Sequence, residues 1–361
     1  MKLFAVILAA GQGTRMRSKL PKVLHPLAGR PLIWYSVENA KRITREKPIV
    51  VVGHNSEKVK EYLGDQVCFV EQNPPLGTGH AVLQAAPYLP GNDDDLVLVM
   101  AADMPLFHYE TVMNLVEMQK KHPGPITLVS IGGTDSRGFG RVVRDARGKI
   151  QAVIEEAQAT PDQLRIQEYN SSIYCINAKW LIANLKRIPL SPKGEYYLTD
   201  LVGIAIRDGL SVQAMMLTDS TEAIGINTRV HLAEAEAVMR QRINRQWMMA
   251  GVTIVDPATT YIESSVSLGM DTIIYPDTII QGKTEIGENC CLGPHTIISD
   301  AQIGNQCKVF YSVVEKAILE DNVDIGPYAH LRSGAHLAQG VHMGNFGEVK
   351  NSYLGPGTKM G

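Results

Sequence analysis

Short apolar runs alternate with longer amphipathic segments through residues 1–228 of the chain. The apolar runs have the length and the Val, Ile and Leu content of buried strands, and the segments between them repeat apolar residues at helical spacing. The runs span residues 4–10, 48–53, 67–72, 96–103 and 126–131, and the clearest helical segments span 32–43 and 109–122. This alternation predicts an α/β domain with a Rossmann-like, mostly parallel sheet.

Distinctive polar residues directly follow several of these predicted strands. They lie in the segments Gly11–Lys22 and Gln72–Thr78 and at Asp103. Because ligands of open α/β sheets bind at the carboxyl ends of the strands, we expect these segments to share one edge of the sheet. They are therefore predicted to line one binding cleft.

Residues 229–250 contain neither glycine nor proline and place apolar residues such as Ile243 and Trp247 at near-helical spacing. An uninterrupted segment of this kind predicts a long helix. We expect this helix to link the domain of residues 1–228 to a second domain at residues 251–361.

Aliphatic residues recur every six positions in this second domain, often followed by glycine. The phased positions are Leu268, Ile274, Ile280, Ile286, Leu292, Ile298, Leu319, Ile325, Leu331, Leu337, Met343 and Val349, with Leu354 and Met360 after a slip of one residue. A period of six is typical of hexapeptide solenoids, whose aliphatic side chains point inward. The sequence therefore predicts a left-handed parallel β-helix. No capping segment follows the last repeat, so we expect an incomplete β-helix, truncated from a longer natural chain.

Composition and charge favour a cytoplasmic protein that binds neither nucleic acid nor membranes. A net charge of −2 with 20% charged residues gives no overall field for nucleic acid or anionic lipid. Five cysteines without metal-ligand spacing indicate a reducing compartment. No apolar stretch is long enough to span a membrane, and the opening run leads directly into a basic loop, as expected of a buried strand rather than an export signal.

The segment of residues 5–24 joins a strand to a glycine loop and then to Arg15, Arg17, Lys19 and Lys22. The loop lacks the third glycine of a dinucleotide-binding fingerprint and does not match a Walker A loop. Backbone N–H groups that glycines leave accessible, with cations beyond them, suit a polyphosphate. We assign phosphate contacts to Arg15 and Lys22, which are flanked by Gly13-Thr14 and by Pro21, and a solvated role to Arg17 and Lys19.

The sequence LAAGQGTRMRSKLPKVLHPLAG resembles the signature of sugar-1-phosphate nucleotidylyltransferases. The form TRM…LPKVLH.LAG is most similar to the family of bifunctional N-acetylglucosamine-1-phosphate uridyltransferases / glucosamine-1-phosphate acetyltransferases. The similarity continues through PLGTGHAV, DMPL, GFGRVVRD, IEEAQAT, GEYYLTD and AIGINTR into the hexapeptide repeats. It covers essentially the whole chain and implies a two-domain enzyme.

The resemblance implies that the first domain uses Mg²⁺ to transfer UMP from UTP to N-acetylglucosamine-1-phosphate, giving UDP-N-acetylglucosamine and pyrophosphate. The matching positions are Arg15 and Lys22 for catalysis; Leu8, Ala9, Gly11, Gly13, Gln72, Gly77 and Thr78 for the nucleotide; Asp103 and Asn227 for the metal; and Gly138, Glu155 and Asn170 for the sugar phosphate. Their chemistry agrees, because amide and hydroxyl groups can satisfy the imide edge of uracil and an all-oxygen pair suits Mg²⁺.

For the second domain, the resemblance implies acetyl transfer from acetyl-CoA in clefts between the subunits of a homotrimer. Arg332 and Lys350 match the sugar-phosphate cations of that site. The family's general-base histidine would directly follow the final GTKMG, so we do not expect the chain as given to acetylate.

Departures from the family pattern leave the choice of sugar open. Ala101-Ala102 stand where the family has Tyr or Ser followed by Gly, and Ser171-Ser172 stand where it has Thr-Gly. A nucleotidylyltransferase for another pair, such as glucose-1-phosphate with UTP or dTTP, is therefore an alternative. A second alternative is a non-catalytic regulatory subunit that binds nucleotide sugars, although the intact Lys22, Asp103 and Asn227 argue against it.

Several histidines are candidates for chemistry. His80 lies in the PLGTGH segment, and His330, His336 and His342 lie six residues apart in the repeats. We expect a structural or solvated role for the row of three, because metal binding needs a convergent geometry that spacing alone does not provide.

Overall fold

The computed structural model describes residues 1–54 and 56–361, which form two compact units. One unit comprises Met1–His25 and Pro31–Leu232, and the other comprises Pro26–Arg30 and Ala233–Gly361. The predicted division into a domain of residues 1–228, a linker helix of residues 229–250 and a domain of residues 251–361 stays a prediction.

The first unit is built on a nine-stranded sheet within the described residues. Its strands are β1 (Leu3–Ala9), β4 (Ile49–Val52), β5 (Cys68–Glu71), β6 (Leu96–Ala101), β7 (Ile126–Gly132), β8 (Arg141–Arg144), β9 (Ile150–Ile154), β10 (Glu168–Asn177) and β11 (Val212–Met216). A short ribbon of β2 (Pro26–Leu27) and β3 (Arg30–Pro31) is separate from this sheet. The main strand order is β11-β7-β10-β6-β1-β4-β5, with β8 and β9 joined through β10. The predicted α/β fold class is confirmed.

Strand β10 makes the sheet mixed, because it runs antiparallel to β6, β7 and β8. The pairs β6–β1, β1–β4, β4–β5 and β7–β11 are parallel, as the alternating pattern predicts. The β10–β7 register shifts between Asn170 and Tyr174, where β10 bulges. This bulge lies beside the cleft described below and was not apparent from the sequence.

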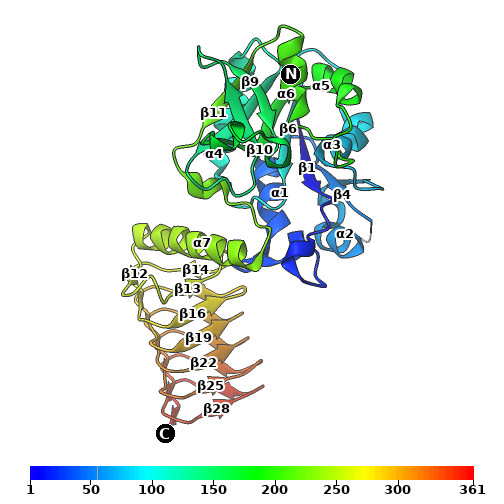
Figure 1. The fold of residues 1–361 in the computed structure, drawn as a ribbon. Helices are drawn as coiled ribbons and strands as arrows, with labels where there is room; N and C mark the ends of the chain where they lie inside the picture. Colours follow the sequence, from blue (N-terminus) through cyan, green and yellow to red (C-terminus); the bar gives the residue numbers. More distant parts are fainter. Residues whose placement is uncertain (55) are drawn as a thin grey trace. The chain divides into compact units, whose positions relative to one another are not determined.

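Helices cover both faces of the sheet (Figure 1). They are α1 (Leu32–Ile43), α2 (Glu57–Leu63), α3 (Thr78–Ala85), α4 (Tyr109–Lys121), α5 (Ala178–Asn184) and α6 (Asp200–Arg207). Buried residues of α1, α2 and α4 form one core with Ala5 and Ile7 of β1, whereas those of α3, α5 and α6 form another with Val6. This separation follows from the alternation of side chains along a strand.

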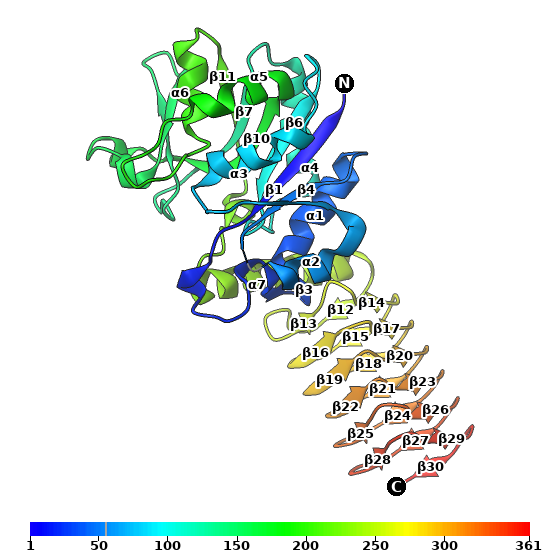
Figure 2. The same ribbon diagram turned by 90° about the vertical axis from the view of Figure 1, so that its right-hand side faces the viewer.

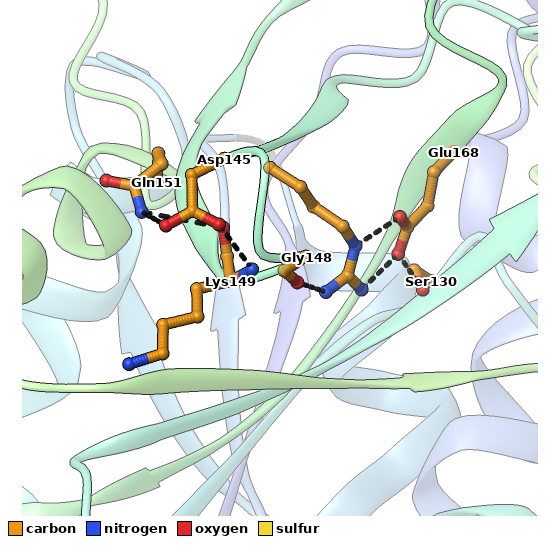
Figure 3. Close-up of polar contacts among 7 residues, drawn as sticks. Ser130, Asp145, Gly148, Lys149, Gln151 and Glu168 are labelled. Carbon is orange, nitrogen blue, oxygen red and sulfur yellow. Dashed lines mark hydrogen bonds and ion pairs between the residues drawn. The ribbon is translucent and has the colours of Figure 1, made fainter.

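The β8–β9 hairpin is tied to β10 by an ion pair, shown in Figure 3. Arg144 donates two hydrogen bonds to the carboxylate of Glu168, at 2.6 and 2.7 Å, and a third to the carbonyl of Gly148 at 2.8 Å. Ser130 of β7 donates to the same carboxylate at 2.8 Å. Residues of β7 and β8 are thus joined to β10 through the carboxylate of Glu168.

The second unit is a left-handed parallel β-helix, whose strands stack in three columns (Figure 2). The first column contains β12 (Thr253–Ile254), β15 (Ile273–Ile274), β18 (Cys291–Leu292), β21 (Lys308–Val309), β24 (Asp324–Ile325), β27 (His342–Met343) and β30 (Lys359–Met360). The second contains β13 (Tyr261–Ile262), β16 (Thr278–Gln281), β19 (Thr296–Ser299), β22 (Val313–Glu315), β25 (His330–Leu331) and β28 (Glu348–Val349). The third contains β14 (Ser267–Leu268), β17 (Glu285–Ile286), β20 (Gln302–Ile303), β23 (Ile318–Leu319), β26 (His336–Leu337) and β29 (Tyr353–Leu354).

The phased aliphatic residues form the core of this β-helix, as predicted. Within one column Ile274 pairs with Leu292, Leu292 with Val309, and Val309 with Ile325. Subtracting the residue numbers gives coils of 18, 17 and 16 residues, respectively. The gap in the six-residue period between Ile298 and Leu319 therefore marks shorter coils within one continuous solenoid.

Helix α7 (Arg229–Met249) occupies the segment predicted to be helical. In the second unit its Ile243 joins the β-helix core, and Met239 and Trp247 pack against that core. Asn244 donates to the carbonyl groups of Pro257 and Thr260, at 3.0 Å each. The helix thus covers apolar surface at the start of the solenoid.

The three histidines of the repeats lie in three different columns, each against an acidic side chain of the preceding coil. His330 contacts Glu315 at 3.0 Å, His336 contacts Glu320 at 2.8 Å, and His342 contacts Asp324 at 3.5 Å. They do not converge on one point, which agrees with the predicted structural row. Among the described residues, no helix has the length and apolarity needed to span a membrane.

Candidate functional site

A cleft of about 690 Å³ opens in the first unit where β1, β5 and β6 end. Its volume falls within the range of small-ligand sites, about 300–1,000 Å³. The lining residues are Leu8–Arg15, Lys22, Val23, Gln72, Pro75, Gly77, Thr78, Ala81, Ala101, Asp103, Glu155, Ser172, Tyr174, Glu195, Tyr197–Thr199 and Asn227. The three segments predicted to share one edge of the sheet therefore meet in one cleft.

The glycine loop after β1 brings Lys22 into this cleft. Gly13 has a φ of 62°, in the left-handed region that L-residues rarely adopt. A Cβ on Gly13 would lie 2.6 Å from the Cβ of Lys22, closer than real side-chain carbons approach. Pro21 precedes Lys22 and restricts the backbone there. Both glycine and proline are thus needed to aim the lysine.

Lys22, Asp103 and Asn227 form one hydrogen-bonded cluster in the lining of the cleft. The ammonium group of Lys22 lies 2.5 Å from Asp103 Oδ2 and 3.1 Å from Asn227 Oδ1. Arg15 donates to the same amide oxygen at 3.0 Å. The backbone N–H of Ile226 also donates to the carbonyl of Asp103, at 2.9 Å, which fixes the two segments side by side. Two cations and two oxygen ligands therefore meet at one point.

This cluster provides the donor set of a divalent metal site. Mg²⁺ in proteins is bound by one or two carboxylates or carbonyls, with substrate phosphates completing its shell. The oxygens of Asp103 and Asn227 converge on one cationic nitrogen, so they can also converge on a metal ion. Asp103 and Asn227 thus fit Mg²⁺, which would stabilise negative charge on the phosphates of a bound nucleotide.

Gln72, Gly77 and Thr78 lie where β5 leads into α3. Gln72 is only 3% exposed, and its side-chain NH₂ donates to the carbonyl of Gly77 at 2.9 Å. Gly77 has a φ of 93°, and a Cβ there would meet the carbonyl oxygen of Tyr196 at 2.6 Å. Thr78 accepts a hydrogen bond from the backbone of Leu198 at 3.0 Å, leaving its hydroxyl proton to donate elsewhere. Amide and hydroxyl groups are thus held rigidly at this end of the cleft.

Glu155 and Tyr174 line the other side of the cleft. The hydroxyl of Thr199 donates to Glu155 at 2.9 Å. Burial raises the pKa of the Glu155 carboxyl, the Thr199 hydrogen bond lowers it, and the carboxyl groups of Asp200 and Glu195 raise it. A half-buried acceptor of this kind can hold a hydroxyl group of a ligand.

Asn170 and Gly138 do not line the cleft themselves. Asn170 is 2% exposed, donates to the hydroxyl of Tyr174 at 2.6 Å, and leaves its buried Oδ1 without a partner among the described residues. An orphaned buried acceptor of this kind is costly unless it serves a ligand or a water molecule. Gly138 lies in the loop before β8 with a φ of 80°. Their predicted sugar contacts remain predictions.

Ser172, Glu195, Tyr197 and Thr199 line the cleft but were not assigned roles from the sequence. Three of them lie in the GEYYLTD segment, which carried the resemblance without showing which side chains reach the cleft. Ser172 lies in the β10 bulge with a φ of 59°, an unusual conformation for serine. This unusual backbone conformation of a polar residue beside the cleft is the feature that points to a functional role for Ser172.

The two predicted cations of the β-helix lie in the second unit. Arg332 pairs with Glu348 at 2.8 Å, and Lys350 lies one residue after β28. Both follow strands of the same column. Their assignment to a sugar phosphate remains a prediction.

Residues 5–170 match the family of MobA-like NTP transferase domains, and residues 265–300 match the bacterial transferase hexapeptide family of six repeats. The chain is 44% identical to the bifunctional protein GlmU of a Geobacillus species over 360 residues, which cover 99% of this chain and 78% of that protein. It is 43% identical to the protein of the same name from Heliobacterium modesticaldum, with the same coverage. The chain belongs to the GlmU family.

Membership of the GlmU family and the NTP transferase domain make this protein a sugar-1-phosphate nucleotidylyltransferase. The GlmU protein of Enterococcus faecalis is a further relative, 41% identical over 359 residues. A solved structure from Bacillus anthracis, named as a candidate glucose-1-phosphate thymidylyltransferase, superposes with a TM-score of 0.54 and 20% identity, covering 65% of this chain and 94% of that one. At that identity the likeness supports the nucleotidyltransferase fold alone.

Proposed function

We propose that this protein transfers UMP from UTP to N-acetylglucosamine-1-phosphate in a Mg²⁺-dependent reaction, producing UDP-N-acetylglucosamine and pyrophosphate. The observation that carries the proposal is the convergence of Arg15, Lys22, Asp103 and Asn227 at one end of the cleft. A protein that only binds nucleotide sugars does not need this pairing of cations with metal-type ligands.

In the proposed reaction, an oxygen of the sugar phosphate attacks the α-phosphorus of UTP. The bond between that phosphorus and the bridging oxygen breaks, and pyrophosphate leaves with the bonding electron pair. Lys22 and Arg15 offset the negative charge that gathers on the phosphates, and Asn227 holds both cations in position. Positioning of the two substrates supplies most of the remaining rate enhancement, since the chemistry requires no protein nucleophile.

The two ends of the cleft suit the two substrates. Gln72 and Thr78 offer the amide and hydroxyl groups that can satisfy a uracil ring. Glu155, with the nearby Asn170, offers acceptors for the hydroxyl and amide groups of the sugar. Leu8, Ala9, Gly11 and Gly13 also line the cleft and offer backbone N–H groups that can bind phosphates.

We further propose a homotrimer assembled through the β-helix and a cytoplasmic location. The hexapeptide match supports the first proposal, and the five free cysteines support the second. In this assembly Arg332 and Lys350 would bind a sugar phosphate in the second unit, with acetyl-CoA as co-substrate in a longer form of the chain. Light scattering should give three times the mass of the chain, and a monomer mass would contradict the trimer.

The test of the main proposal is pyrophosphate release by the purified protein with Mg²⁺ and UTP. N-Acetylglucosamine-1-phosphate and glucose-1-phosphate are compared as acceptors. We expect rapid turnover of the acetylated sugar and a loss of about a hundredfold in Lys22→Ala, as for removal of one transition-state contact worth about 3 kcal/mol. Lys19→Ala is the matched control, because this exposed cation of the same segment lies outside the cleft lining.

If the protein turned over glucose-1-phosphate alone, the proposed type of reaction would stand, but the proposed sugar substrate would be wrong. A folded protein that binds UTP but turns over neither acceptor would overturn the proposed reaction.

A further inference from the structure

The imidazole ring of His80 lies between the amide groups of two glutamines. Its Nδ1 is 3.1 Å from Nε2 of Gln72, which follows β5, and its Nε2 is 3.0 Å from Nε2 of Gln84, one turn later on α3. The aromatic ring of Tyr196 lies nearby, with its centroid 6.3 Å from that of the imidazole. No carboxylate or ammonium group is paired with His80 in the described part of the chain. The environment of the ring is therefore polar but neutral.

Hydrogen bonding fixes which nitrogen of His80 carries the proton. Gln72 Nε2 also donates to the carbonyl of Gly77 at 2.9 Å, so this end of the Gln72 amide must be the NH₂ group. An NH₂ group only donates, and Nδ1 of His80 must therefore accept from it. A neutral imidazole has one donor and one acceptor, so its Nε2 carries the proton and donates. Gln84 consequently presents its amide oxygen to His80, since the two ends of an amide are assigned by their hydrogen bonds.

This arrangement also determines what Gln72 presents to the cleft. Both hydrogens of its NH₂ group have acceptors, Gly77 and His80. Its Oε1 has no donor among the described residues, and the side chain lines the cleft although it is only 3% exposed. Gln72 thus offers a fixed, unpaired acceptor to a ligand.

We propose that His80 is a positioning and specificity-determining residue, which holds Gln72 with its acceptor facing the base and so selects uracil over cytosine. The inference rests on the proposed function, in which a uracil nucleotide occupies this end of the cleft. Uracil carries a proton on N3 and can donate it to Gln72 Oε1, whereas N3 of cytosine carries a lone pair that opposes the same oxygen. A site built for one hydrogen-bonding pattern leaves polar groups unpaired with the other.

The proposal makes opposite predictions for two substitutions of Gln84. In Gln84→Glu the carboxylate can only accept, so it keeps the proton on Nε2 of His80 and leaves Gln72 unchanged. In Gln84→Lys the ammonium can only donate, so the proton moves to Nδ1. The N–H on Nδ1 then opposes the NH₂ group of Gln72, which can turn its oxygen toward His80 only by giving up its hydrogen bond to Gly77. Whether the amide turns or is pushed aside, its oxygen is no longer held toward the base. Gln84, the residue substituted in both variants, does not line the cleft.

The experiment measures kcat/KM for UTP and for CTP in the wild type and both variants at one fixed pH. We expect the UTP/CTP ratio to stay within about twofold in Gln84→Glu and to fall by about tenfold or more in Gln84→Lys, mainly through KM. An unchanged ratio in folded Gln84→Lys overturns the proposal.

If Gln84→Lys does not fold, a second pair of variants tests whether His80 positions Gln72. His80→Asn retains an oxygen that can accept from Gln72 and should preserve part of the UTP preference, whereas His80→Leu should lose it. Equal ratios in the two variants would contradict the positioning role. If the wild type turns over no nucleotide, the proposed function fails by itself, and calorimetric affinities for UTP and CTP in the same variants still test His80.

Discussion

Gly13 and Lys22 lie so close that a Cβ on the glycine would come within 2.6 Å of the Cβ of the lysine. Gly13→Ala must therefore displace Lys22 from Asp103 and Asn227. We expect turnover to fall by about a hundredfold, as for loss of the lysine itself. Initial rates of pyrophosphate release would measure the loss, and a variant within threefold of the wild type would contradict the packing argument.

Gly209→Ala is the matched control for this variant. Gly209 has a φ of 77°, but a Cβ there would have no neighbour within 4 Å. Both substitutions carry the cost of a left-handed alanine, about 1–2 kcal/mol. Thermal unfolding should therefore show destabilisation in both variants, with the overlap adding to the cost of Gly13→Ala, while only Gly13→Ala loses turnover.

The hydrogen bond from Thr199 to Glu155 predicts a shift in pH dependence. In the proposed function Glu155 accepts from a sugar hydroxyl, and the ionised carboxylate is the stronger acceptor, so we expect activity to fall as the pH drops through its pKa. Burial raises this pKa and the Thr199 hydrogen bond lowers it. Thr199→Val should therefore move the acid limb of kcat/KM to higher pH and raise KM for the sugar phosphate, leaving KM for UTP unchanged. Thr199→Ser keeps the hydroxyl and should restore the wild-type profile.

Substitutions of the two neighbouring serines in the β10 bulge should have different effects, one on sugar binding and the other on stability. Ser172 lines the cleft, whereas Ser171 is buried and donates to the carbonyl of Val129 at 2.9 Å. We expect Ser172→Ala to change KM for the sugar phosphate with little effect on unfolding. Ser171→Ala should instead lower the free energy of unfolding by about 1–3 kcal/mol, because it leaves a buried carbonyl unpaired. The reverse pattern would show that Ser172 does not face the sugar.

The buried cation of Arg141 makes Glu156 a determinant of stability. Arg141 has a side chain that is 5% exposed and contacts Glu156 at 2.7 Å. Glu156→Ala should cost about 1–3 kcal/mol in urea unfolding, because it leaves a buried charge with fewer partners. Glu117→Ala, which breaks the exposed pair with Lys120, should cost less than about 1 kcal/mol. Equal costs would contradict the burial argument.

The same ion pair predicts how stability depends on pH. The hydrogen bond from Arg141 lowers the pKa of Glu156 in the folded state. Its contribution is therefore fully present above the ordinary glutamate pKa of about 4.3 and is lost as the pH falls through the lower folded-state value. The difference in unfolding free energy between the wild type and Glu156→Ala should stay constant near neutral pH and shrink below about pH 4.

The sequence predicted the parallel part of the sheet and the glycine loop because both depend on local patterns. Apolar runs mark β1, β4, β5 and β6, and parallel topology alone places the residues after them at one edge. Strand β10 was missed because its antiparallel pairing is non-local and its polar bulge hides the alternation of a strand. Asn170 and Ser172 owe their positions to that bulge, so their surroundings could not be predicted.

The β-helix was predicted because each coil repeats the same inward-facing position. Its register between Ile298 and Leu319 was not predicted. Coils of 17 and 16 residues there interrupt the six-residue period of the sequence, although their strands continue to pair with those of the neighbouring coils. The position of His80 was also hidden, since spacing on a helix cannot show that Gln72 approaches the ring from another segment.

The hydrogen bonds of Asn227 with Arg15 and Lys22 span 212 and 205 positions of the chain. The first and last segments of the first unit therefore meet at the cluster of Arg15, Lys22, Asp103 and Asn227. During synthesis on the ribosome, the sheet can begin to form before residue 227 has emerged, but the cluster cannot. A nascent chain that has completed most of this unit would still be unable to use nucleotide. Activity would appear only when Asn227 has reached Arg15 and Lys22.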